Sequence, residues 1–165
     1  MATETILSKE YLCNLFEYSK GSLYRKIRTA NCVYEGEKAG FTRKDGYRQI
    51  KVNQKPYLEH QIVFIMHHGY KPSIIDHING IKTDNRIENL RKASFDENAH
   101  NAKRKSTNTS GVKNVSYSKR HKSWMVRVQA NKTRKLIGLF KDLELAELVA
   151  IEARNKYHRE YANHG

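Results

Sequence analysis

Hydrophobic positions in the first half of the chain follow two different spacings. Between the polar residue Ser8, a plausible helix cap, and the next polar run, apolar side chains recur at helical intervals. The stretch 46–58 alternates around a polar break and predicts a small hairpin. The stretch 59–68 is apolar at helical spacing and precedes Gly69, which predicts a short buried helix. The first helical face consists of Tyr11, Leu12, Leu15 and Phe16.

The second half of the chain changes to a period of two. Apolar residues alternate with polar ones over 115–117, 124–128 and 137–139, and this predicts three short antiparallel strands. From Asp142 the spacing becomes helical and predicts an amphipathic helix backing the sheet. One sheet face should pack on that helix through Trp124, Val126, Val128 and Ile137. The other should present Met125, Arg127, Gln129 and Leu136.

Charge divides the chain more sharply than hydrophobicity does. The net charge is +14, and no Asp or Glu occurs between Glu97 and Asp142, where twelve Lys or Arg residues lie. The segment 101–111 has no large apolar side chain, so we expect a linker there. A balance this basic indicates a polyanionic partner, either nucleic acid or an anionic membrane surface.

Several classes of protein are excluded by composition. No run approaches the roughly 18 apolar residues of a membrane span, and no basic amphipathic helix has an apolar face large enough for a membrane surface. The N-terminus lacks the pattern of a secretory signal, so we expect a cytoplasmic protein, in the host cell if the chain is phage-encoded. Cys13 and Cys32 are too far apart for a Cys-x-x-Cys pair, and we expect no structural zinc.

Polar residues that could take part in catalysis concentrate in 74–80 and 84–91. Asp76 and His77 lie between isoleucines just before Asn79 and Gly80, so a strand should end there and both side chains could serve one site. Residues 90–94 could pair back on this strand, and Ser94 could cap a helix through a capping box with Glu97. The arrangement is a hairpin, a loop and a helix, although an ordinary hairpin turn carries similar residues.

These residues resemble the HNH nucleases of the ββα-metal fold, especially the homing-endonuclease branch with Asp-His on the first strand. The resemblance covers about 46–101 and rests on Ile-Asp-His-Ile-Asn-Gly followed by Asn-Arg-Ile-Glu-Asn-Leu. Asn89 follows His77 by twelve positions and Asn98 follows it by twenty-one, which agrees with the spacing of that family. His60 stands where this branch often has His followed by Arg, but Gln61 follows it here.

The resemblance implies a role for each matching residue. Asp76 and Asn98 would hold one Mg²⁺ or Mn²⁺ ion per active site, since carboxylate and amide oxygens are hard ligands. His77 would be the general base, because its ordinary pKa leaves much of it neutral at physiological pH. Asn89 would be a support residue that holds the loop and the imidazole.

The C-terminal region resembles the plant-type APETALA2 DNA-binding fold, which also occurs behind HNH nucleases of phage and mobile elements. The matching marks are 110–115, Trp124 with its alternating valines, 136–140 and a Glu- and Ala-rich helix. Asn114 departs from the usual Gly, and Val126 from the usual Ala. Arg127 and Gln129 would contact bases in a major groove. The other expected DNA contacts are Lys103, Arg104, Lys105, Lys113, Lys119, Arg120, Lys122, Lys132, Arg134 and Lys135.

The sequence thus predicts an α+β protein with an HNH core of the ββα-metal fold, followed by a small three-stranded antiparallel sheet packed on one helix. We expect an N-terminal helical extension (1–45), a nuclease domain (46–102), a basic linker (103–110) and a DNA-binding domain (111–165). The expected function is hydrolysis of phosphodiester bonds in double-stranded DNA, by nicking or by double-strand cutting. No membrane or small-molecule substrate is expected, and the protein would be a monomer or a homodimer. The alternative is a DNA-binding protein with an inactive nuclease fold.

Overall fold

The structure is a computed structural model that describes residues 7–28, 33–130 and 132–164. Contacts divide the chain into two compact units, Met1–Ala93 and Ser94–Gly165. The division falls inside the range 46–102 expected for the nuclease domain, and the domain limits stay a prediction. No helix of the described residues is long and apolar enough to cross a membrane.

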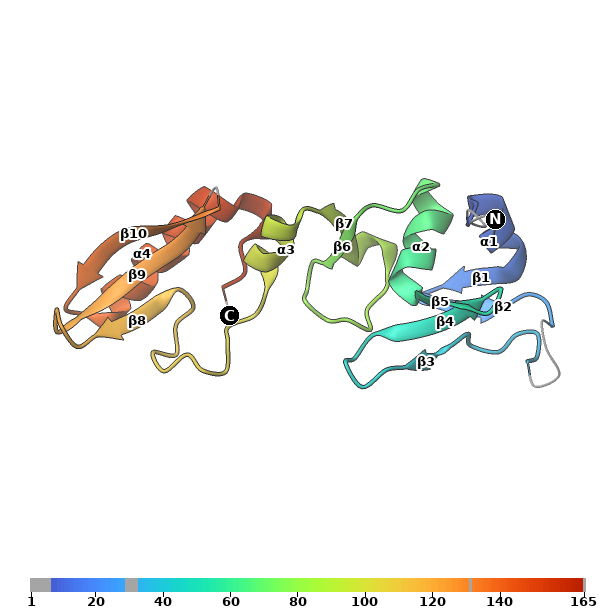
Figure 1. The fold of residues 1–165 in the computed structure, drawn as a ribbon, viewed down its shortest axis with the longest axis horizontal. Helices are drawn as coiled ribbons and strands as arrows, with labels where there is room; N and C mark the ends of the chain where they lie inside the picture. The colour runs from blue at the N-terminus through green and yellow to red at the C-terminus, as the bar shows by residue number, and fades with distance from the viewer. Residues whose placement is uncertain (1–6, 29–32, 131, 165) are drawn as a thin grey trace. The chain divides into compact units, whose positions relative to one another are not determined.

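The first unit begins with a helix and a tight hairpin (Figure 1). Ser8 caps α1 (Lys9–Leu15) by accepting a hydrogen bond from Tyr11 N, which confirms the predicted cap. Strands β1 (Phe16–Ser19) and β2 (Ser22–Arg25) follow and pair antiparallel. Leu12, Phe16 and Leu23 are buried in the core of this unit, so the N-terminal segment packs on the rest of it. Phe16, which the spacing placed on the helical face, is instead the first residue of β1, because the helix ends at Leu15.

The hairpin predicted over 46–58 is confirmed as β4 (Arg48–Val52) and β5 (Lys55–Leu58). Asn53 and Gln54 form its two-residue turn with φ of 49° and 63°, the left-handed values that such turns require. A short strand that the pattern did not predict, β3 (Phe41–Thr42), pairs on the other side of β4. The helix α2 (Glu59–His68) then packs on this sheet and ends at Gly69, as predicted.

The last elements of the first unit form the hairpin of the predicted motif. Strand β6 (Ile74–His77) pairs antiparallel with β7 (Leu90–Ala93), and the loop between them ends in a short 3₁₀ turn, η1 (Ile87–Asn89). The N-terminal hairpin supports this loop: Tyr18 Oη accepts a hydrogen bond from Ile87 N at 3.0 Å. At Gly21, where φ is +81°, a Cβ would lie 2.8 Å from Arg86 N, so only glycine fits this close approach.

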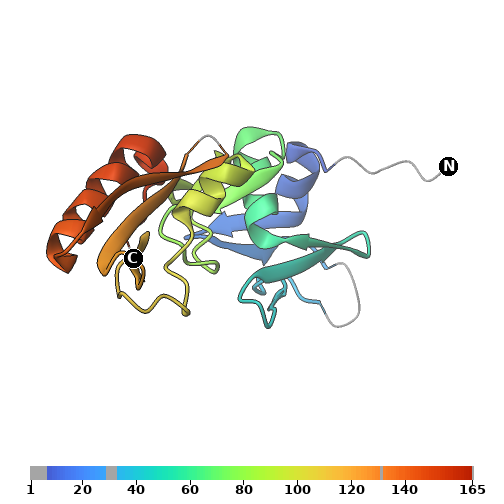
Figure 2. The same cartoon turned by 60° about the vertical axis from the view of Figure 1, so that its left-hand side comes forward.

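The second unit contains α3 (Phe95–Asn101) and the predicted sheet and helix. Its strands β8 (Val115–Ser118), β9 (Ser123–Ala130) and β10 (Thr133–Phe140) are ordered β10-β9-β8, and all pairs are antiparallel. Helix α4 (Leu143–His158) lies along one face of the sheet, and a short turn, η2 (Arg159–Tyr161), follows it (Figure 2). Val126 and Val128 are buried while Arg127 is exposed, so the predicted alternation is confirmed.

Candidate functional site

Asp76 and His77 occupy the last two positions of β6. Their side chains are buried, with exposed fractions of 4% and 5%, and their partners across the hairpin are Arg91 and Leu90. The strand ends at His77, and the backbone turns immediately, because Gly80 N donates to His77 O at 2.8 Å. This ending is what the Asn-Gly pair predicted. It places two adjacent polar residues in a buried setting, where each needs defined partners.

The carboxylate of Asp76 is paired with Arg91. Both Nε and Nη2 of Arg91 lie 2.8 Å from Oδ2 of Asp76, a short charge-assisted contact. The two residues face each other across the β6–β7 hairpin, so the register itself creates the pair. Sequence reasoning did not assign a role to Arg91, although it lies in the motif. A cation bound by Asp76 would have to share this carboxylate with the guanidinium.

The imidazole of His77 contacts a buried amide from the loop before η1. Its Nε2 lies 3.0 Å from Oδ1 of Asn85, whose exposed fraction is 1%. Asn85 Nδ2 in turn donates to Oε2 of Glu59 at 2.7 Å. Glu59 opens α2 and is fully buried. Neither partner was predicted, because Asn85 and Glu59 are 26 positions apart and nothing local signals that they meet.

Glu59 is held from two further directions. Its Oε1 accepts a hydrogen bond from Leu23 N at 3.1 Å, and its Oε2 lies 3.1 Å from Nε of Arg48. Arg48 Nε makes no hydrogen bond among the described residues, so this second contact is an ion pair. The Arg48 side chain is fixed by Nη2, which donates to Ala39 O at 2.7 Å. A buried carboxylate with this many partners is a rigid one.

Two rings, those of His60 and Tyr47, lie close to the ring of His77. The His60 ring lies edge-on at 5.0 Å and the Tyr47 ring tilted at 6.1 Å, both measured between centroids. Burial lowers the pKa of His60 to about 3, with smaller contributions from the charges of His77 and Lys71. Burial, followed by the charges of Asp45 and Asp76, raises the pKa of Tyr47. His60 therefore stays neutral near pH 7.

Asn89 fastens the loop that follows β6. Its Oδ1 accepts from Asn79 N at 3.0 Å, and its Nδ2 donates to Asn79 Oδ1 at 3.0 Å and to Asp84 O at 2.7 Å. These bonds tie the beginning of the loop to its end. The contact to the imidazole comes from Asn85 instead. The catalytic assignment of Asn89 stays a prediction.

The helix that carries Asn98 belongs to the second unit. Ser94 caps α3 in the predicted capping box, in which Ser94 Oγ accepts from Glu97 N and Glu97 Oε2 accepts from Ser94 N. Asn98 is exposed on this helix. At the end of α3 the His100 ring stacks on His158 with centroids 3.8 Å apart. Asp76 and Asn98 are thus described in different units, and their pairing stays a prediction.

The predicted metal ligands are oxygen donors. Among the described residues no group of three His, Cys, Asp or Glu side chains could hold a metal ion. Cys13 is half-buried with a free thiol, and Cys32 lies outside the described residues. The predicted ligands Asp76 and Asn98 offer one carboxylate and one amide oxygen. That set fits Mg²⁺, which usually keeps several waters and takes few protein ligands.

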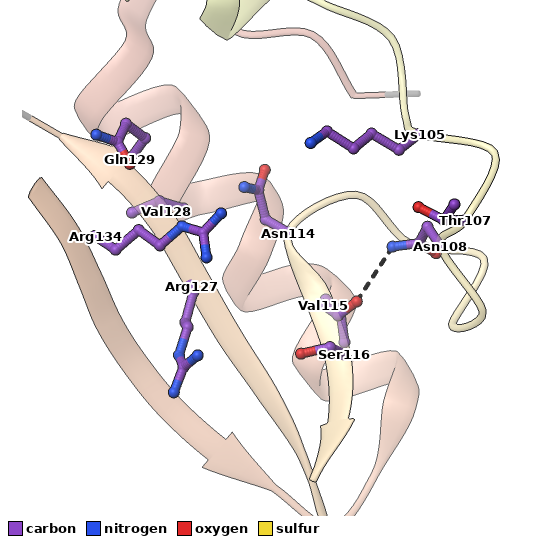
Figure 3. A pocket seen from close by; sticks show the side chains of 10 residues that line it. All are labelled: Lys105, Thr107, Asn108, Asn114, Val115, Ser116, Arg127, Val128, Gln129 and Arg134. Atoms are coloured by element: carbon purple, nitrogen blue, oxygen red, sulfur yellow. Dashed lines mark hydrogen bonds between the residues drawn. The ribbon is translucent and has the colours of Figure 1, made fainter. Parts of the chain in front are cut away.

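A basic cavity of about 440 Å³ lies on the face of the second unit's sheet that is turned away from α4. Gln129 on β9 is paired with Arg134 on β10, and Arg127 lies two residues before Gln129 on the same face. Figure 3 shows these side chains and Lys105 around one hollow. The cavity is lined by Lys105, Thr107, Asn108, Asn114, Val115, Ser116, Arg127, Val128, Gln129 and Arg134, with no carboxylate among them.

The residues predicted to contact DNA differ in how exposed their side chains are. Lys113 is turned inward: its Nζ donates to the carbonyl oxygens of His100 at 2.9 Å and Ala102, and burial lowers its pKa to about 8. A phosphate contact by Lys113 would require these bonds to break. The other cations that we expected on DNA have exposed side chains: Lys103, Arg104, Lys105, Lys119, Arg120, Lys122, Arg127, Lys132, Arg134 and Lys135.

Comparison with known proteins supports the motif assignment. Residues 57–100 match the HNH endonuclease family. Protein 3.8 of Escherichia phage T7 is 36% identical over 90 residues, which cover 53% of this chain and 72% of that protein. No solved structure matches the chain. The matched range 57–100 contains Glu59, Asp76, His77, Asn85 and Asn89, together with most of α3.

Proposed function

Because the chain belongs to the HNH endonuclease family, we propose that it is a divalent-metal-dependent endonuclease that hydrolyses phosphodiester bonds of double-stranded DNA. The observation that carries this proposal is the buried pair Asp76 and His77 at the end of β6, inside the matched range. A carboxylate and an imidazole at consecutive positions of the strand end supply a cation ligand and a proton acceptor, which are the two groups that phosphodiester hydrolysis needs.

Each residue of the site has a separate task. His77 takes the proton from the attacking water, and Asn89 holds the loop that borders the imidazole. Asp76 and Asn98 would hold one Mg²⁺ or Mn²⁺ ion. When bound, that ion would polarise the phosphoryl oxygen and stabilise the leaving oxygen. The rings of His60 and Tyr47, close to His77, would limit the access of bulk water to it.

The sheet of the second unit would hold the DNA. Arg127 and Gln129 project from the face that bears the basic cavity, and a sheet of this kind can enter the major groove. The exposed lysines and arginines of 103–135 would contact phosphates and supply affinity without sequence preference. The resemblance to the APETALA2 fold supports this arrangement, as does the absence of carboxylates from the cavity lining.

One observation favours a second candidate, a DNA-binding protein with an inactive nuclease fold. Asp76 carries a two-pronged contact from Arg91, which would compete with a cation for the carboxylate. Such a protein would keep the basic face of the second unit and lose the chemistry of the first. The two candidates differ in cleavage and agree in binding.

A supercoiled-plasmid assay separates the candidates. Wild type and His77→Ala are incubated with Mg²⁺, Mn²⁺ or EDTA, and nicked and linear products are scored. We expect products only for wild type with metal, and the ratio of nicked to linear DNA then separates a nickase from a double-strand cutter. If wild type shifts the plasmid on a gel but does not cut it with either metal, or cuts it equally in EDTA, the nuclease proposal is wrong.

A further inference from the structure

A buried chain of polar side chains leads from the imidazole of His77 into the core of the first unit. Nε2 of His77 lies 3.0 Å from Asn85 Oδ1, and Asn85 Nδ2 lies 2.7 Å from Glu59 Oε2. The exposed fractions are 5% for His77, 1% for Asn85 and 0% for Glu59. Three segments distant in sequence thus meet in one line: the end of β6, the loop before η1, and the start of α2.

The chemistry of the last member fixes the direction of every bond. A carboxylate only accepts hydrogen bonds, so the amide nitrogen of Asn85 must face Glu59. The amide oxygen of Asn85 then faces His77, and an oxygen can only accept. The proton of the neutral imidazole must therefore sit on Nε2. In this tautomer Nδ1 carries the lone pair, so Nδ1 is the nitrogen that would accept a proton from water.

We propose that Asn85 and Glu59 are positioning residues that fix the tautomer and the ring orientation of His77. This inference rests on the proposed role of His77 as the general base. Neither residue needs to touch DNA or metal, since both act through the imidazole. Such a hydrogen-bonded partner commonly orients a functional histidine, and it is often a carboxylate. Here the amide of Asn85 contacts the imidazole, and the carboxylate of Glu59 holds that amide.

Glu59, the last member of this series of hydrogen bonds, is held in place by further contacts. Glu59 accepts from Leu23 N at 3.1 Å and pairs with Arg48 at 3.1 Å. It is also the first residue of α2, where the helix dipole favours a negative charge. A carboxylate with no exposed surface and no partners would be strongly destabilising, and these contacts compensate for its burial in the core. A fixed acceptor at one end keeps the amide of Asn85 from turning over.

The substitution Glu59→Gln tests the direction of the bonds with almost no change in shape. Leu23 N still needs an acceptor, so the oxygen of Gln would face Leu23 and its NH₂ group would face Asn85, with loss of the ion pair to Arg48. Asn85 would then turn its amide over and present Nδ2 to His77. The imidazole would have to accept at Nε2 and carry its proton on Nδ1, which is the wrong tautomer for the proposed base.

The first measurement is the ¹⁵N NMR spectrum of His77 in full-length protein with labelled histidine, at a pH where the ring is neutral. We expect a protonated Nε2 in wild type and a shift toward protonated Nδ1 in Glu59→Gln. A wild-type ring protonated on Nδ1, or an unchanged tautomer in Glu59→Gln, would overturn the proposal. If Glu59→Gln does not fold, Asn85→Ala replaces it, with a mixture of tautomers expected and a wild-type pattern contradicting the proposal.

The second measurement is kinetic. In Glu59→Gln we expect kcat for plasmid cleavage to fall about 10- to 100-fold, the usual cost of losing an outer support residue, with an unchanged KM for DNA. Glu17→Gln, an exposed carboxylate on β1, is the matched control and should change neither. In a His77→Ala background, Glu59→Gln should not change whatever residual cleavage long incubations at high enzyme concentration detect, because its effect passes through the imidazole.

The two readouts separate the two proposals. A wild-type protein that shows the expected tautomers but never cuts DNA would remove the nuclease function and leave the positioning chain standing. A protein that cuts, with a KM effect in Glu59→Gln or an additive loss in the double variant, would show a general structural role for Glu59 and overturn the positioning role.

Discussion

The His77 site and the basic face of the second unit hold their polar side chains in opposite ways. In the first, Asp76, His77 and Asn85 are each at most 5% exposed, and each makes a short hydrogen bond to a defined partner: Asp76 to Arg91, and Asn85 to both His77 and Glu59. In the second, Arg127 and Arg134 are exposed around an open cavity. Buried networks are cooperative, so one loss removes the whole function, whereas exposed charges contribute small, additive and salt-dependent amounts. The comparison predicts that a single substitution in the His77 site abolishes cleavage, whereas a single substitution on the basic face only reduces DNA affinity by a small amount.

The largest effect should come from Asp76→Asn, which keeps the shape of the side chain and removes its charge. We expect the Mg²⁺ concentration for half-maximal cleavage to rise at least about tenfold, since even the outer partners of a metal site cost that much, and the maximal rate to fall. DNA affinity at low metal should stay within about twofold. Asp142→Asn, at the cap of α4, is the control. An unaltered metal titration would remove Asp76 from the site.

The next largest effect should be on sequence preference. Arg127→Ala should weaken binding to the preferred sequence by about 1 to 3 kcal/mol while leaving the cleavage rate at saturating DNA unchanged. Competition binding with preferred and scrambled duplexes measures the difference. If Arg127→Ala weakens binding to both duplexes equally, Arg127 is a phosphate contact and not a base contact.

A third test concerns stability, because the pKa of His60 is lowered to about 3 in the folded protein and is near 6.5 when unfolded. The unfolded chain then binds one more proton between these values, so the free energy of unfolding should fall by about 1.4 kcal/mol per pH unit as the pH drops from 6.5. Above pH 6.5 this contribution is fully present. Urea unfolding of wild type and His60→Gln from pH 7 to 4.5 measures it, and equal slopes for both proteins would contradict it.

The smallest effect should come from a single exposed cation outside the cavity. Lys122→Ala should lower DNA affinity equally for all sequences and reduce the slope of log affinity against log salt by about one. Binding titrations at several salt concentrations give that slope. A change confined to one sequence would move Lys122 into the base-reading group and blur the contrast between the two regions.

Local patterns predicted most of the elements but not the contacts that complete the site. The hairpin over 48–58, α2, the β6–β7 pair, and the sheet with α4 all follow from spacing, turn residues and caps. The β3 strand is only two residues long and gives no periodic signal. Glu59 looked like an ordinary first-turn acid, and only the tertiary fold brings it to Asn85. Lys113 is a second case in which only the tertiary fold reveals the contact. Its charge predicted an exposed position, but its Nζ donates to the backbone carbonyl oxygens of His100 and Ala102.

The strand order β10-β9-β8 leaves β10 (Thr133–Phe140) at an edge of the sheet. An open edge can recruit a strand from another molecule and start aggregation. Arg134 and Lys135 lie on this edge, and two such edges brought together would repel each other. The charges that we propose to contact DNA would therefore also oppose edge-to-edge aggregation. Neutralising both of them to weaken DNA binding should make the purified protein more prone to precipitate at high concentration.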